Sequence, residues 1–165
     1  MTLDQTIRQF LDHQLSNGRP PHTIGAQQRD LNLLLTRLGS DCDIRSITAI
    51  HTDSFFLSDP VQKQADGKQK MTSSINRTRA SIKGFFRWLT DTGQIDHNPA
   101  IGIQIKHKNQ KPPVFLTEDE KRTLLKTIRS QKGWQTNRDL VIVNLFLHTG
   151  IRLSELVNLD IADVN

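Results

Sequence analysis

The sequence predicts a mainly α-helical protein, with a bundle of helices first and a second helical region after it. Apolar residues recur at spacings of three and four through most of the chain, which is the period of an amphipathic helix. Only nine glycines and six prolines occur in 165 residues, and most of them stand between the apolar stretches, where they end helices. No internal repeat is present, so the fold is not a repeat array.

Four helices are expected in the first hundred residues. The first is indicated by apolar residues at helical spacing and ends in "SNGRPP"; its stripe is Leu3, Ile7, Phe10, Leu11 and Leu15. Thr23 is the expected cap of the second helix, and Gly39 ends it. A third, shorter helical segment covers about residues 44–57.

A polar loop, "SDPVQKQADGKQK", separates these helices from the fourth. Thr72 or Ser73 is expected to open the fourth helix, and Gly93 follows its end. Its apolar stripe includes Ile82 and Phe86. Four helices of this size can bury one shared core.

A second region follows an extended basic linker in which prolines prevent helix formation. We place the first domain at residues 1–105, the linker at 106–116 and the second region at 117–165. The "TEDE" that begins at Thr117 is a capping box for a helix. Another helix, at about 137–148, is apolar nearly all round and is expected to be buried, with Gly150 ending it.

Charge points to a polyanionic partner. The net charge is +5 with a pI near 9.7, and ten bases but only three acids lie between residues 62 and 111. Within the fourth helix Arg79, Lys83 and Arg87 stand in one row at i, i+4 and i+8. A row of like charges gains stability when it binds a phosphate backbone. The alternative is a solvated basic face that serves solubility.

Several classes of function are excluded or disfavoured. The longest apolar run, residues 140–147, is too short to cross a bilayer, and the first ten residues do not read as a signal peptide. A single cysteine, Cys42, excludes an internal disulfide and suits a reducing compartment. The six histidines show no metal-ligand spacing. We therefore expect a cytoplasmic protein with no membrane partner.

Arg152 stands two residues after the helix-ending Gly150 and one turn before Glu155. A guanidinium can hold two oxygens of one phosphate and stays charged at any working pH, and an acid one turn away can fix its orientation. The alternative is a surface ion pair worth at most about 1 kcal/mol.

The residues around Arg152, "HTGIRLSEL", resemble the box around the first catalytic arginine of the tyrosine recombinases, the phage integrase and Xer-like family. Upstream, "PHTIGAQQRDLNLLL" resembles the second helix of that family's core-binding domain, and "SINRTRASIKGFFRWLTDTGQIDHNPAIGI" its last helix and exit strand. "PPVFLTEDEKRTLL" is similar to the entry to the catalytic domain. The resemblance implies a four-helix core-binding (SAM-like) domain, followed by the first helices of a mixed α/β catalytic domain that is truncated.

The resemblance also implies a chemistry. The family cuts DNA with a tyrosine hydroxyl, forms a 3′-phosphotyrosine and frees a 5′-hydroxyl, with no metal or other cofactor. By position Arg152 matches the first catalytic arginine, and Glu155 matches the acid that supports it. This sequence contains no tyrosine, and it lacks the family's later H-x-x-R box. The chain is therefore expected to bind a double-stranded recombination site without cutting it, beside other recombinase protomers in the full-length form.

The candidate DNA contacts lie on the second helix, on the fourth helix and in the basic segments around them. The second helix offers side chains that can read base edges, and the rest supply cations for phosphates. They are Thr23, Gln27, Gln28, Arg29, Lys70, Arg77, Arg79, Lys83, Arg87, Lys106 and Lys108. Two alternatives remain open: a DNA-binding remnant or regulator without catalysis, and a helical interaction protein with no DNA role.

Overall fold

The computed structural model describes residues 1–106 and 112–163, which form two compact units, Met1–Gln110 (unit 1) and Lys111–Asn165 (unit 2). All regular elements in these residues are helices, so the predicted mainly α fold is confirmed. None of the described helices is both long and apolar enough to span a membrane.

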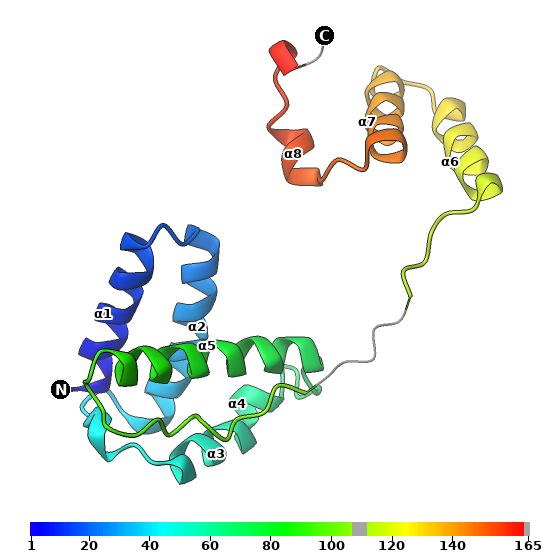
Figure 1. The fold of residues 1–165 in the computed structure, drawn as a ribbon. Helices are drawn as coiled ribbons and strands as arrows, with labels where there is room; N and C mark the ends of the chain where they lie inside the picture. The colour runs from blue at the N-terminus through cyan, green and yellow to red at the C-terminus, as the bar shows by residue number, and fades with distance from the viewer. Residues whose placement is uncertain (107–111, 164–165) are drawn as a thin grey trace. The chain divides into compact units, whose positions relative to one another are not determined.

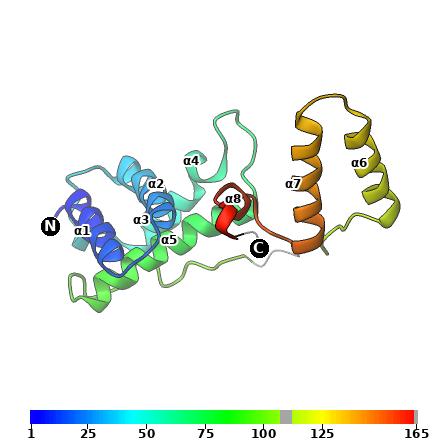
Figure 2. The same ribbon diagram turned by 90° about the horizontal axis from the view of Figure 1, so that it is seen from above.

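Unit 1 is a helical bundle built around one long helix. Its first two helices, α1 and α2, form an antiparallel pair joined by a short loop, and α2 also packs against α3 and α5 (Figures 1 and 2). The elements are α1 (Leu3–Ser16), α2 (Pro21–Leu38), the 3-10 turn η1 (Ile44–Ser46), α3 (Ala49–Leu57), α4 (Asp59–Gln62) and α5 (Thr72–Asp91).

The core of unit 1 is apolar and aromatic, and α5 supplies its centre. Phe85 and Phe86 are fully buried on α5, and the ring of Phe10 from α1 meets Phe85 edge-on with centroids 5.5 Å apart. Most of the stripes predicted from helical spacing are buried or partly buried, although Leu15 is 60% exposed. One face of each main helix therefore joins a single shared core, as predicted.

The start of α2 differs from the prediction. The helix begins at Pro21 with Pro20 as its cap residue, so Thr23 lies inside the first turn and caps nothing. Proline suits the first helical position because its φ is already helical and its missing N–H would have no partner there. The predicted end is correct: Gly39 follows the helix with a φ of +93°.

Two segments of unit 1 differ from what the sequence indicated. The polar loop after α3 contains the short helix α4. The exit strand that the resemblance implied is not formed in the described residues. After α5 the chain runs back along that helix without a regular strand, and we call residues 95–106 the return segment (Figure 1). Its buried residues are Ile95, Pro99, Ala100 and Ile103, and the buried Thr52 hydroxyl donates to the Pro99 carbonyl at 2.9 Å.

Unit 2 contains α6 (Glu118–Ser130), α7 (Gln135–Thr149), α8 (Leu153–Val157) and the 3-10 turn η2 (Ile161–Asp163). The predicted start of α6 and the predicted end of α7 are both confirmed. Thr117 forms a capping box with Glu120, and Gly150 ends α7 in the left-handed conformation, at φ +67° and ψ +18°.

The expectation that α7 is buried is wrong for the described residues. No side chain of α7 is fully buried, and Val141 is 59% exposed. Within the described part of unit 2, α6 is the one helix that packs extensively against α7. A single neighbouring helix cannot cover α7, because apolar residues lie on nearly all sides of it.

Candidate nucleic-acid interface

Helix α5 carries the predicted row of cations, but its three members have different surroundings. The amphipathic pattern of α5 buries Ile82, Phe85 and Phe86, which turns the row toward the helix's exposed side. Arg79 and Lys83 are partly buried, and Arg87 is exposed. The row therefore exists as a surface feature, with two partly buried cations near its start and an exposed one, Arg87, near its end.

Arg79 is held in place from two sides. Its guanidinium carbon lies 5.8 Å from the centre of the Phe56 ring, and its Nη1 donates to the Asn76 side-chain oxygen at 3.3 Å. Arg79 and Lys106 line the same shallow hollow with Phe56. The structure thus brings together two of the predicted cations that are distant in the sequence.

Asn76 also fastens the return segment to α5. Its amide donates to the Lys106 carbonyl at 2.6 Å and accepts from the Lys106 N–H at 3.1 Å. Lys83 makes a similar contact, because its ammonium donates to the Ile103 carbonyl at 2.8 Å. An ammonium has three donors, so Lys83 retains capacity for a phosphate.

Arg87 and Lys70 are the remaining cations of this group. Arg87 makes an exposed ion pair with Asp91, one turn along α5, at 3.5 Å. Lys70 donates to the Pro60 carbonyl at 2.6 Å, which ties the end of the loop to α4. Lys108, the last predicted cation, lies outside the described residues.

Arg77 lies on the other side of α5 from Arg79, because successive helical residues are ~100° apart. Its Nη2 and Nε donate to the two carboxylate oxygens of Asp30 on α2, at 3.0 and 3.3 Å. Asp30 is only 1% exposed, and it also accepts from the hydroxyls of Thr78 at 2.9 Å and Ser81 at 2.8 Å. No sequence pattern singles out Asp30, because its partners are 47 to 51 residues away along the chain.

The predicted base-reading residues on α2 divide into two groups. Gln28 and Arg29 are exposed, as a reading surface requires. Thr23 is partly buried, and the Gln27 side-chain oxygen is buried without a hydrogen-bond partner in the described residues. Of these four candidates, Gln28 and Arg29 are thus the two that are exposed for contact with bases.

In unit 2, Arg152 and Glu155 form the predicted pair. The Glu155 carboxylate accepts from the Arg152 backbone N–H and from its Nη1, both at 2.8 Å. Arg152 is the cap residue of α8, and its side chain is 80% exposed. The backbone N–H and then the side chain of Arg152 hold the pKa of Glu155 below its ordinary value.

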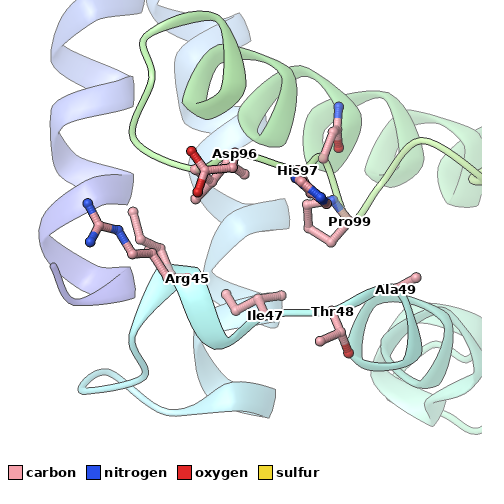
Figure 3. Close-up of a pocket in the computed structure, with 10 residues that line it drawn as sticks. Arg45, Ile47, Thr48, Ala49, Asp96, His97 and Pro99 are labelled. Carbon is pink, nitrogen blue, oxygen red and sulfur yellow. The ribbon is translucent and has the colours of Figure 1, made fainter.

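A pocket that contains none of the predicted site residues lies between residues 44–49 and the start of the return segment (Figure 3). It is lined by apolar side chains together with Arg45, Asp96 and His97. Its charges are mixed in sign, so it does not share the cationic character of the α5 surface. Across residues 1–106 and 112–163, no group of three or more His, Cys, Asp or Glu side chains is suited to hold a metal ion.

Comparison with known proteins gives a consistent result. The family described as phage integrase, N-terminal SAM-like domain, matches residues 7–93. The tyrosine recombinase XerC of Chromobacterium violaceum is 30% identical over 163 residues, covering 99% of this chain and 52% of that protein. XerC of Lactobacillus delbrueckii subsp. bulgaricus is 29% identical over 168 residues, covering all of this chain and 54% of the relative.

A structural relative has the same fold. The Tn1549 transposon integrase, solved in complex with circular intermediate DNA, matches with a TM-score of 0.73 at 23% identity, over 100% of this chain and 51% of that one. The chain spans about half the length of the relatives it matches. The family match covers more than half of the chain, from α1 to the end of α5. This chain therefore belongs to the tyrosine recombinase (phage integrase) family, and residues 7–93 are its N-terminal SAM-like domain.

Proposed function

We propose that unit 1 binds double-stranded DNA at a recombination site, and that the cations of α5 contact its phosphates. The observation that carries this proposal is the row Arg79, Lys83 and Arg87 on the exposed side of a helix within the family's SAM-like domain. The DNA complexes of the Tn1549 integrase, which shares the fold, support it. We also propose that residues 1–105 and 117–165 are separate domains joined by a linker, and the division of the chain into two compact units supports this.

Phosphate binding fits the way in which the cations are held. Arg79 is fixed by the Phe56 ring and Asn76, so little side-chain entropy is lost when its remaining donors bind an anion. Arg87 has a long, exposed side chain that can adjust its position to reach a DNA phosphate. Gln28 and Arg29 on α2 are proposed to contact base edges, with Thr23 and Gln27 beside them.

Within the family's reaction, Arg152 is proposed to stabilise the phosphate under attack, and Glu155 to orient it. The two hydrogen bonds from Arg152 to Glu155 leave the other guanidinium donors, on an 80% exposed side chain, available to an anion. The sequence contains no tyrosine. We therefore propose that this chain binds DNA in the cytoplasm without forming a phosphotyrosine, and that other recombinase protomers are its partners on the same DNA.

Salt dependence tests this proposal. The chain is mixed with a fluorescein-labelled 30-base-pair duplex, and anisotropy is measured between 25 and 250 mM KCl. Neutralising three phosphates predicts a slope of log Kobs against log[salt] of about −2.7 or steeper. A helical protein with an apolar protein partner and no DNA role would show either no binding or a slope near zero. Either result would contradict the proposal.

A further inference from the structure

Asp30 is a buried carboxylate that the proposed DNA contacts do not use. It sits on α2, is 1% exposed, and accepts hydrogen bonds from Arg77, Thr78 and Ser81, all on α5. A charge this deeply buried is costly unless it is paired and fully hydrogen-bonded, and both of its oxygens are. A buried carboxylate with these hydrogen bonds holds its partners in one arrangement. One of those partners also reaches solvent, where its orientation can affect binding.

That partner is Arg77. Its side chain is 53% exposed, although its Nε and Nη2 point inward to Asp30. No partner of Nη1 occurs in the part of the chain that the structure describes, so this end of the guanidinium is open to an anion. Because the fork is held along the Nε–Nη2 edge, its plane and its direction are already set.

The cations of the α5 row are held differently. Arg87 has one ion-pair partner in residues 1–106, the exposed Asp91 at 3.5 Å, and both side chains are more than half exposed. An exposed i, i+4 pair of this kind has little strength and imposes little order. Among the described cations of unit 1, Arg77 is therefore the one that a buried acid orients. Arg87, which is paired with an exposed acid on the same helix, serves as the control.

We infer that Asp30 is a positioning residue, which holds the Arg77 guanidinium as a pre-oriented ligand for one DNA phosphate. The inference rests on the proposed DNA binding by unit 1. The same hydrogen bonds hold α2 against α5 next to Arg29. The distance between the phosphate contact and the proposed base-reading residues of α2 is therefore fixed. Orienting the arginine before DNA arrives removes part of the entropy cost of binding.

The sign of one substitution separates positioning from simple electrostatics. Asp30→Asn removes a negative charge, and charge alone predicts tighter binding to DNA. Positioning predicts weaker binding, because an amide cannot accept from Arg77 along two oxygens, so the guanidinium is no longer fixed. Asp91→Asn on the same helix is the matched control, since it also removes one negative charge from an arginine pair.

The experiment measures affinity for the same 30-base-pair duplex at one low salt concentration, with folding checked by circular dichroism melts. Asp30→Asn is expected to weaken binding about tenfold, the loss typical of one charge-assisted hydrogen bond. Arg77→Ala should weaken it by the same factor, and the double variant no further. Asp91→Asn should bind as tightly as the parent chain or slightly tighter.

Two further variants keep the test decisive if Asp30→Asn does not fold. Arg77→Lys keeps the charge but loses the fork, and Ser81→Ala removes one hydrogen bond to Asp30 without changing charge. Both are expected to weaken binding. Parental affinity in a folded Asp30→Asn or in Arg77→Lys would overturn the inference and leave the proposed function standing. Absence of duplex binding by the parent chain would overturn both.

Discussion

The carboxylate of Glu155 joins the backbone and the side chain of Arg152, with one oxygen 2.8 Å from the Arg152 backbone N and the other 2.8 Å from its Nη1. One acid thus caps α8 and orients the arginine at the same time. The orientation of the Arg152 guanidinium is therefore linked to the folding of the first turn of α8. Anything that discharges Glu155 should affect both.

Low pH should destabilise the first turn of α8. The hydrogen bonds from Arg152 lower the folded-state pKa of Glu155 below its ordinary value of 4.5. Its stabilising contribution is therefore complete above the unfolded-state pKa and is lost as the pH falls through the folded-state pKa. We expect the amide resonances of residues 153–156 to move toward random-coil positions below pH 4.5, as followed by NMR between pH 6 and 3.

Glu155→Gln is the control for this titration. Glutamine can still accept from the backbone N–H of Arg152, but it does not titrate in this range. The variant should lack the pH-dependent movement of residues 153–156. A movement of the same size in Glu155→Gln would show that another group is responsible.

Unit 2 should associate through its exposed apolar residues. Unit 1 has a core of many fully buried side chains, whereas Ile128 is the one buried apolar residue among the described residues of unit 2. Val141 on α7 is 59% exposed, and further apolar side chains such as Trp134 (78%) are exposed in the same unit. Exposed apolar surface of this extent favours binding to another protein surface.

We expect concentration-dependent association in sedimentation velocity runs, and Val141→Lys should reduce it. Ile50→Lys makes the same chemical change at a position on α3 of unit 1 that is 79% exposed. That control should leave the association unchanged. Equal effects of the two variants, or a parent chain that stays monomeric at 100 μM, would contradict the assignment of the contact to unit 2.

Features set by a few neighbouring residues were predictable from the sequence. The capping box from Thr117 and the left-handed Gly150 were both placed correctly, because each depends on local backbone chemistry. The apolar stripes on α1 and α5 predicted the core for the same reason. The cap at Thr23 was wrong, since the adjacent prolines start α2 earlier than a threonine cap would.

Features that depend on distant contacts were not predictable. The resemblance implied an exit strand after α5, yet the return segment forms no strand, and Ala100 and Ile103 are buried in the shared core. Asp30 is marked by no sequence pattern, and only the packing of α2 against α5 brings it to Arg77. The burial of these three residues is created by tertiary packing, which local sequence patterns do not specify.

Binding of a DNA duplex across a range of salt concentrations, compared between two triple variants of the chain, tests whether the α5 row contacts phosphates. The first replaces Arg79, Lys83 and Arg87 with alanine. The second, matched in charge, replaces Arg8, Arg19 and Arg37, which are exposed in unit 1 and outside the proposed interface. Circular dichroism confirms that both variants are folded, which matters because Lys83 also contacts the return segment.

If the α5 row binds phosphates, its removal should weaken binding and make the slope of log Kobs against log[salt] shallower by about 2.7, close to one unit for each lost contact. The matched variant should weaken binding less and keep the slope of the parent chain, because its charges act only at a distance. An unchanged slope in the α5 variant, or an equal change in the matched variant, would contradict the proposed interface.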